Sequence, residues 1–186
     1  LGNNLEITAP TGMASFNING VTIHSLLGLP IAGTASNNLS PRYKQHYQKR
    51  LEHMKYLIID EFSMIGLKTL YNIDHRLRDI KGNDLLFGGV NVILIGDIFQ
   101  ICPVKDKPLF QNNDEDNILD LSKNEKSGRL FYLNFEKVVI FTENVRQQGN
   151  EKNQEKFRKA LDNIRVGNLK NDDYETLTER MYSEQT

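Results

Sequence analysis

Two adjacent carboxylates, Asp60 and Glu61, directly follow a short apolar run, Tyr56–Ile59. A buried strand is apolar on both faces, so two acids at its tip are costly unless they meet cations or water. Hydrolysis of a nucleotide supplies both partners: the first carboxylate holds the water shell of Mg²⁺, and the second polarises the attacking water. The alternative is a strand that ends at a solvated turn, and the two acids alone leave both interpretations open.

A second polar group follows the apolar run Val90–Ile95. Gly96 ends this run, and Pro103 prevents a helix from continuing the loop after it. Within that loop, Gln100 is a neutral side chain able to contact a phosphate or position water, and Asp97 could hydrogen-bond across the site. The alternative for Gln100 is an ordinary exposed loop residue.

A third group follows the first apolar run of the chain. Pro10 and Gly12 break that run into a turn, where Thr11 and the freed backbone amides could hold a phosphate. Further on, Phe16 and His24 could stack on unpaired bases. The alternatives are a core position for Phe16 and a helix-start position for His24, and for each residue taken alone the alternative is the better interpretation.

A fourth group follows the run Lys137–Phe141 and contains Arg146. An arginine just beyond a strand end can reach the γ-phosphate of a nucleotide as an arginine finger in cis. The alternative is a surface salt bridge with Glu143, which would be the better interpretation of this arginine on its own.

Four runs of strand length alternate with helical patterns: Leu5–Ala9, Tyr56–Ile59, Val90–Ile95 and Lys137–Phe141. One predicted helix starts at Ser40-Pro41, and another has a single apolar face ended by Gly82, composed of Leu70, Ile73, Leu77 and Ile80. This alternation predicts an α/β fold with a mostly parallel sheet flanked by helices. Carboxyl ends of parallel strands meet at one edge, so all four polar groups are expected to converge there.

The segment Gln111–Lys126 is polar and acidic and is predicted to be a surface insertion. After Gln148-Gly149-Asn150 the pattern changes to helix only. The predicted organisation is therefore an α/β part over residues 1–148 and a helical segment over residues 149–186.

The composition of the 186 residues suits one α/β domain or slightly more. The single cysteine, Cys102, cannot form an internal disulfide, and no apolar run has the length of a membrane span, so we expect an intracellular protein without a membrane partner. The net charge of −1 argues against nucleic-acid binding by bulk electrostatics, but it leaves room for a local basic surface.

One helical region is fairly basic, with Lys44, Lys49, Arg50 and Lys55. Most faces of this kind are only solvated, and a nucleic-acid contact is the alternative.

In this order, the four groups resemble the Pif-one (petite integration frequency) family of ATP-dependent DNA helicases, within helicase superfamily one. The segments Ala9–Gly12 and Thr22–Ser25 look like its motif Ia, and Ile58–Glu61 looks like motif II, the Walker B element. Motif III and its lead-in are similar to Phe87–Gly89, Gly96-Asp97, Gln100 and Pro103-Val104, and motif IV is similar to Thr142-Glu143 with Arg146-Gln147.

The resemblance implies a RecA-like P-loop core that binds ATP and Mg²⁺ and moves 5′ to 3′ along single-stranded DNA. It implies that Asp60 coordinates Mg²⁺, that Glu61 is the catalytic base, and that Gln100 senses the γ-phosphate. Arg146 would be the arginine finger, and Asp97 would belong to the nucleotide-binding residues. The residues along the DNA strand would be Pro10, Thr11, Gly12, Phe16 and His24.

The chain contains no G-x-x-x-x-G-K-[ST] sequence, the P-loop that the family has upstream of motif Ia. We therefore expect an internal fragment of a helicase: residues 1–148 would form most of the first motor domain, and residues 149–186 would lead to the second. The expected parent is a monomer that acts at single-stranded DNA and duplex junctions in repair, recombination or telomere maintenance. Its expected compartment is the nucleus, with the mitochondrion as the alternative.

A different class of protein also fits part of the pattern. The chain could be a degenerate relative without a P-loop that holds single-stranded DNA or a partner without turnover. A retained Asp60-Glu61 pair has no evident use in such a protein, which favours the helicase.

Overall fold

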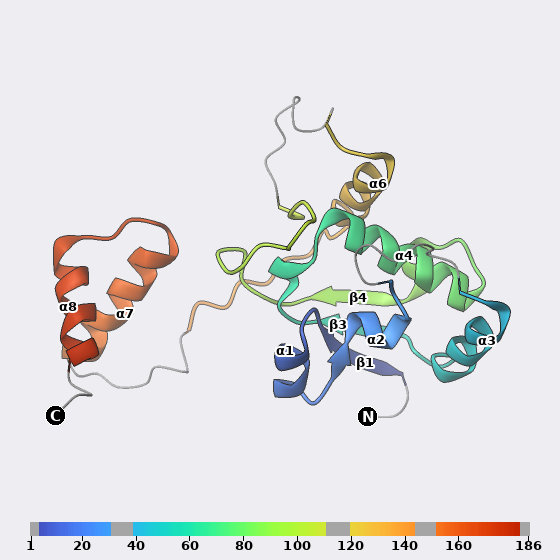
Figure 1. Cartoon of the computed structure of the whole chain (residues 1–186), viewed down its shortest axis with the longest axis horizontal. Coiled ribbons are helices and arrows are strands. Elements are labelled where there is room, and N and C mark those ends of the chain that lie inside the picture. The colour runs from blue at the N-terminus through green and yellow to red at the C-terminus, as the bar shows by residue number, and fades with distance from the viewer. Residues whose placement is uncertain (1–3, 31–38, 111–119, 144–151, 183–186) are drawn as a thin grey trace. The chain divides into compact units, whose positions relative to one another are not determined.

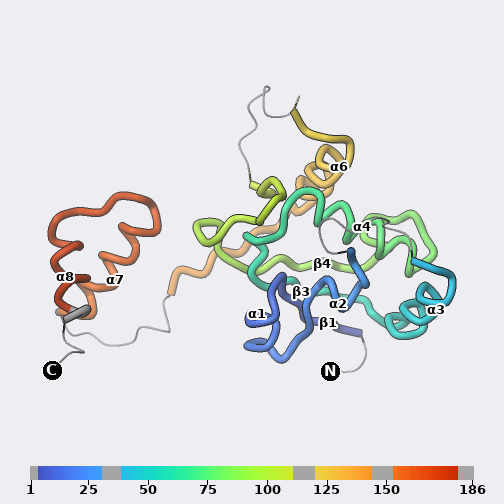
Figure 2. Tube along the Cα trace, in the orientation of Figure 1, coloured from blue at the N-terminus to red at the C-terminus, as the bar shows by residue number. Residues whose placement is uncertain are grey.

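A computed structural model describes residues 4–30, 39–110, 120–143 and 152–182. The chain forms two compact units, Leu1–Glu136 and Lys137–Thr186, each with its own internal packing (Figure 1, Figure 2). Among the described residues, no helix combines the length and the apolar character needed to cross a membrane.

The first unit is built on a four-stranded sheet with all strands parallel, in the order β2-β1-β3-β4. The strands are β1 (Leu5–Ala9), β2 (Val21–Thr22), β3 (Tyr56–Ile59) and β4 (Asn91–Leu94). In register, Ile59 at the end of β3 pairs with Thr8 of β1 and with Leu94 of β4, so these three strands end together. The parallel sheet with flanking helices confirms the predicted α/β class.

Five helices and two short 3₁₀ turns complete the described part of this unit. They are α1 (Gly12–Asn17), α2 (Ile23–Leu27), α3 (Pro41–Arg50), η1 (Phe62–Met64), α4 (Leu67–Lys81), η2 (Leu86–Gly89) and α6 (Lys123–Tyr132). Pro41 begins α3, and Gly82 ends α4 in the left-handed conformation at φ 67°, as the sequence predicts.

The core forms where the apolar stripe of α4 meets the sheet and α2. Its side chains are excluded from solvent because they occupy the inner face of each element, as for Leu26, Leu27, Leu57, Ile59, Leu70, Ile73 and Leu77. In β3, Tyr56 is exposed but Leu57 and Ile59 are buried. The strand that precedes Asp60 is therefore firmly anchored in the core.

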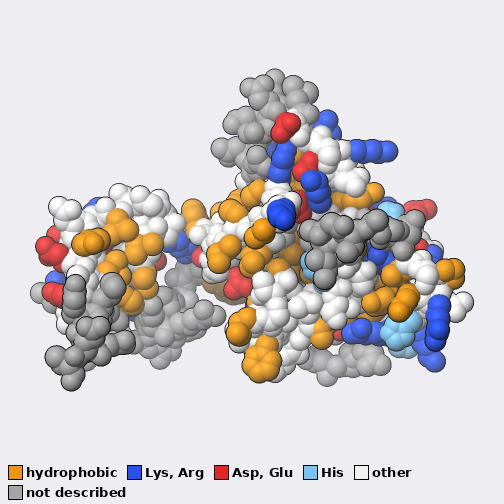
Figure 3. Space-filling model, viewed as in Figure 1, with side chains coloured by type: hydrophobic (Ala, Val, Ile, Leu, Met, Phe, Trp, Pro, Cys, Tyr) orange, Lys and Arg blue, Asp and Glu red, His pale blue; other side chains and the backbone are white. Residues whose placement is uncertain are grey.

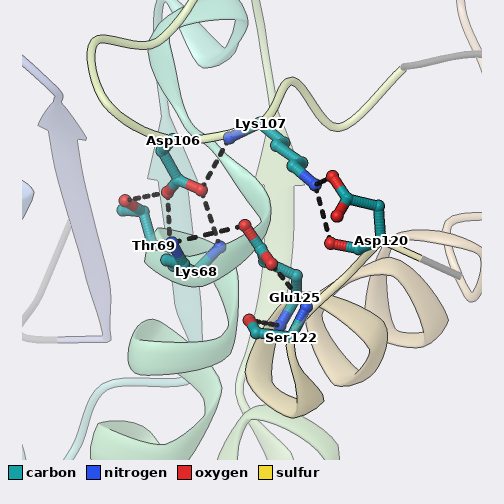
Figure 4. A network of polar contacts seen from close by, with 7 residues as sticks. All are labelled: Lys68, Thr69, Asp106, Lys107, Asp120, Ser122 and Glu125. Carbon is teal, nitrogen blue, oxygen red and sulfur yellow. Dashed lines mark hydrogen bonds and ion pairs between the residues drawn. The ribbon is translucent and has the colours of Figure 1, made fainter. Parts of the chain in front are cut away.

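A polar network ties the loop after β4 to α4 and α6 (Figure 4). The Asp106 carboxylate accepts hydrogen bonds from the backbone amides of Lys68 and Thr69 at 3.0 and 2.9 Å, and from the Thr69 hydroxyl at 2.8 Å. It therefore caps the first turn of α4 from a distant part of the chain. Buried Glu125 of α6 accepts from the Ser122 amide at 2.6 Å and lies 3.3 Å from the Lys68 amine.

The prediction of a surface insertion over Gln111–Lys126 is wrong at its carboxyl end. Residues from Lys123 onward belong to α6, because Ser122 and Glu125 form a reciprocal capping box that starts a helix. Residues 111–119 lie outside the described part of the chain, so the rest of this prediction is not tested.

The predicted strand Lys137–Phe141 is also wrong. The segment is not part of any sheet among the described residues, and its side chains from Val138 to Phe141 are 77–85% exposed. An apolar run becomes a strand only where a neighbouring strand pairs with its backbone, and unit 2 offers none in the described residues.

The helices in the described part of unit 2 are α7 (Lys152–Arg165) and α8 (Asn171–Tyr182). Buried Asp173 joins them: its carboxylate accepts from the Asn163 side-chain amide at 2.7 Å and from the Lys170 backbone amide at 3.0 Å. This pair agrees with the helical tail expected from the sequence. The division between residues 148 and 149 concerns the motor domains of a longer protein and stays a prediction.

Candidate functional site

The carboxyl ends of β1, β3 and β4 lie side by side and bring three of the four polar groups to one edge of the sheet. The Asp60 amide donates to the Thr8 carbonyl at 2.8 Å, and the Phe62 amide donates to the Ile95 carbonyl at 3.0 Å. The segment Asp60-Glu61 is thus held between the ends of its two neighbouring strands. The fourth group cannot be placed in the same way, because Arg146 lies outside the described residues.

Glu61 has an unusual backbone, with φ 53° and ψ 44° in the left-handed region. Residues with a side chain rarely adopt this conformation, and it is often found at functional sites. Gly96, at the end of the neighbouring strand, leaves room for this backbone because it has no side chain. A Cβ atom at this glycine would lie 2.9 Å from the Phe62 amide nitrogen and 3.3 Å from the Glu61 Cα. The two strand ends are therefore in direct backbone contact at the predicted site.

The carboxylates of Asp60 and Glu61 are partly exposed, and within the described residues neither one takes part in a hydrogen bond or ion pair. No group of three or more His, Cys, Asp or Glu suited to a metal occurs in that same part of the chain. Mg²⁺ is commonly held by one or two carboxylates together with water and substrate phosphates. This donor set fits a magnesium ion that arrives with a nucleotide.

The loop after β4 is a tight turn. The Asp97 carboxylate accepts from the Phe99 backbone amide at 3.0 Å, and the Gln100 amide donates to the Asp97 carbonyl at 3.1 Å. Asp97 therefore shapes the loop, as short polar side chains do in turns. The Gln100 side chain is exposed and has no partner among the described residues, so it is available to a ligand at this edge.

The turn after β1 starts α1. Thr11 is its N-cap, and the Thr11 hydroxyl accepts from the Ala14 amide at 3.2 Å. This bond stabilises the helix start in the usual way. Pro10 is partly buried and Gly12 is exposed, with no atom within 4 Å of the position that a Cβ would take. A phosphate contact at these residues stays a prediction.

The two predicted stacking residues differ in accessibility. Phe16 is 78% exposed, so the core position that the sequence favoured for it is wrong. His24 is partly buried at the start of α2, as its alternative interpretation states, and burial lowers the pKa of its imidazole below the ordinary value. The lowered pKa favours the neutral form of the ring. Phe16 is the better placed of the two to meet a base.

Sequence reasoning missed two features of the site. The contact of Gly96 with Glu61 depends on strand register, and its sequence signal is only a glycine directly after a strand next to the acidic tip. The second feature is the cap of α4. Ser63 lies just before this helix, but its hydroxyl is buried in η1 and has no hydrogen-bond partner among the described residues. Asp106 caps α4 instead, and no local signal marks a cap supplied from so far along the chain.

A comparison with protein families matches residues 2–175 to the PIF1-like helicase family. The chain belongs to this family. The expected Pif-one resemblance is thereby confirmed, and so is the RecA-like fold, since the solved structures it resembles are Pif1 helicases.

Among curated relatives, the chain is similar to the ATP-dependent DNA helicase PIF1 of Saccharomyces cerevisiae (strain YJM789), with 33% identity over 168 residues. This match covers 89% of the chain and 18% of the yeast protein. Among solved structures, one describing DNA unwinding at forked dsDNA by two coordinating Pif1 helicases matches with a TM-score of 0.72 and 31% identity, covering 96% of this chain and 42% of that one.

A second solved structure is the Pif1 helicase from Bacteroides in complex with ADP-AlF3 and ssDNA. It matches with a TM-score of 0.63 and 32% identity, over 93% of this chain and 39% of that one. The chain thus spans about a fifth of the curated relative and about two fifths of each structural one.

Proposed function

We propose that this chain is part of the first motor domain of an ATP-dependent DNA helicase, and we call the longer helicase the parent protein. The parent couples ATP hydrolysis to 5′ to 3′ movement along single-stranded DNA and to duplex unwinding, in repair, recombination or telomere maintenance. One observation carries the proposal: the unpaired acids Asp60 and Glu61 follow a buried strand, and backbone hydrogen bonds from Asp60 to Thr8 and from Phe62 to Ile95 fix this segment at the sheet edge.

We assign each residue a role from its place in the chain and from the family resemblance, and the described positions of Asp60, Glu61 and Gln100 support these roles. Asp60 continues directly from anchored β3, so it suits the fixed role of holding the water shell of Mg²⁺, which neutralises charge on the phosphates. Glu61 is turned by its left-handed backbone and suits the general base that takes a proton from the attacking water. Exposed Gln100 would contact the γ-phosphate, and Arg146 would stabilise charge in the transition state.

The DNA strand would lie near α1. Phe16 and Met13, 78% and 74% exposed, present large apolar side chains on this short helix, and bases stack on such surfaces without regard to sequence. Pro10, Thr11, Gly12 and His24 would line the same path. Single-stranded and forked DNA are named for two of the similar structures, which supports this class of substrate.

The rival function is a module that holds DNA without turnover. Two carboxylates without partners, next to a strained backbone, are unfavourable in a protein that needs them only for structure. The absence of a P-loop sequence from these residues is what keeps the rival open.

Replacement of Glu61 by Gln in the parent protein tests the proposal. Loss of the general base should lower the DNA-stimulated ATPase rate by about 10²- to 10⁴-fold while DNA binding is kept. Glu136→Gln is the matched control, because Glu136 is an exposed acid at the end of unit 1. A Glu61→Gln protein that hydrolyses ATP and unwinds DNA at the rate of this control would remove Glu61 as the base.

A further inference from the structure

Helix α3 carries a concentrated positive charge. Its ten residues include Arg42, Lys44, Lys49 and Arg50 and contain no acid, whereas the whole chain has a net charge of −1. A helix that is merely solvated usually mixes both signs along its outer face. The charge of α3 is therefore a local property that the composition of the chain does not explain.

The helix has two distinct faces. Leu51 and Met54, just beyond its end, are buried, and Tyr47 packs partly buried against the core. On the opposite side, Arg42, His46 and Lys49 follow one another at helical spacing and are all exposed. In Figure 3, Lys, Arg and His side chains gather over the end of unit 1 where α3 lies.

Most of these cations have no partner. Lys44 pairs with Asp79, but the side chains of Arg42, Lys49, Arg50 and Lys55 form no hydrogen bond or ion pair within the described residues. Lys49 and Arg50 lie in the last turn, where the helix dipole favours cations. Helix stability is therefore enough to explain their positions.

Arg42 does not fit that explanation. It lies in the first turn of α3, where the helix dipole disfavours a cation, and the turn has neither an acid nor a side-chain cap from Ser40. Arg42, His46 and Arg50 also follow one another at intervals of four residues. Two like charges at this spacing weaken an isolated helix. This face is therefore poorly arranged for stability and well arranged for a polyanion.

The location of α3 separates it from the site described above. The helix leads through Lys55 into the amino end of β3, whereas Asp60 and Glu61 follow the carboxyl end of that strand. The Lys55 and Tyr56 amides both donate to the Asn4 carbonyl, which fixes this connection at the amino edge of the sheet. A ligand on α3 is thus neither the nucleotide nor the strand beside α1.

We propose that the outward face of α3 binds the phosphate backbone of duplex DNA, an inference that rests on the proposed helicase function. From Arg42 to Arg50 the helix rises by about 12 Å, and a duplex presents about one negative charge per 1.7 Å of its axis. A straight row of cations matches such a rigid array. The exposed tyrosine of α3, Tyr43 (64% exposed), lies on the side of Tyr47 and not in the row of Arg42, His46 and Lys49. The row itself is a helix surface, whereas a single strand prefers a groove lined by several aromatic side chains.

The test is duplex binding by the parent protein with Arg42→Gln and Lys49→Gln together. Lys123→Gln with Lys126→Gln is the matched control, since it removes two exposed lysines from α6 with the same change of charge. Binding of a blunt duplex is measured without nucleotide between 50 and 200 mM salt. The salt slope is the slope of the logarithm of affinity against the logarithm of salt concentration. Loss of two phosphate contacts should reduce its magnitude by about 1.8, so the factor by which affinity falls over this range should be about twelve times smaller.

The α3 variant should bind the duplex more weakly than the control and keep ATPase stimulation by single-stranded DNA. Equal duplex affinity and salt slope in the two variants would overturn the proposal and assign this face to solvent or to an acidic protein. If instead the unmodified parent shows no DNA-stimulated ATPase activity, the helicase function fails, and the duplex titration still decides whether α3 binds DNA. Circular dichroism of both variants checks that their total helix content matches that of the unmodified parent.

Discussion

The backbone conformation of Glu61 aims the side chain that we propose as the general base. Its left-handed φ of 53° costs energy in any residue with a side chain, and the neighbouring strand end must compensate for it. The Phe62 amide bonds to Ile95, and Gly96 leaves the space that the Glu61–Phe62 backbone fills. We infer that Gly96 is a positioning residue for Glu61.

Gly96→Ala in the parent protein should therefore lower the ATPase rate at saturating DNA by at least about tenfold, equivalent to 1.4 kcal/mol of the barrier. The added methyl group would meet the Phe62 amide nitrogen at 2.9 Å and displace Glu61. Gly82→Ala is the control, because Gly82 also has a positive φ, at 67°, but a Cβ there meets nothing within 4 Å. Equal ATPase rates in the two variants would refute the positioning role.

At the scale of elements, α6 is held by charge as well as by packing. Burial alone would raise the pKa of Glu125, but hydrogen bonds from Ser122 and the nearby Lys68 charge outweigh it, so the pKa lies below its ordinary value. A carboxyl group with a lowered folded-state pKa stabilises the fold above its unfolded pKa. This contribution is lost as the pH falls through the folded value.

Hydrogen exchange of the parent protein can detect this loss locally. Corrected for intrinsic rates, protection of the α6 amides should fall as the pH drops below about 4.3, the ordinary glutamate value. In Glu125→Gln the protection should already be reduced at pH 7 and should change less with pH. Unchanged protection of α6 in the native protein across this range would show that Glu125 does not anchor the helix.

The elements that sequence reasoning found are those whose signal is local. Apolar runs of four to six residues gave β1, β3 and β4, and the stripe from Leu70 to Ile80 gave α4 with its end at Gly82. The missed features are either too short to have a signal or depend on partners far along the chain. Two-residue β2 is too short to have a pattern, the Asp106 cap comes from a distant loop, and Lys137–Phe141 has strand composition without a described strand to pair with.

In the candidate site, too, local signals could be predicted from the sequence and contacts between distant segments could not. Strand ends marked Asp60, Asp97 and Thr11 in advance, because a parallel sheet brings its carboxyl ends together. The left-handed Glu61 and its contact with Gly96 could not be read from the sequence, since both depend on how two strands are registered. Exposure of Phe16 was likewise decided by packing.

At the scale of the whole molecule, these 186 residues contain the acids that we assign to a nucleotide site but not the P-loop sequence that would bind most of the triphosphate. The exposed apolar run from Val138 to Phe141 also lacks a covering partner in the described residues. We expect the isolated chain to bind ATP poorly and to hydrolyse almost none. Titration with a fluorescent ATP analogue, with the parent protein as the positive control, measures the first property, and DNA-stimulated phosphate release by the isolated chain would contradict the second.

The most direct test of the central claim is a crystal structure of the parent protein with ADP, aluminium fluoride, Mg²⁺ and single-stranded DNA. The proposal predicts Asp60 beside the metal through water, Glu61 at the attacking water, and the side chains of Gln100 and Arg146 against the fluoride group that mimics the γ-phosphate. A nucleotide bound elsewhere, or any of these four side chains directed away from it, would contradict the assignment of this sheet edge as the hydrolysis site.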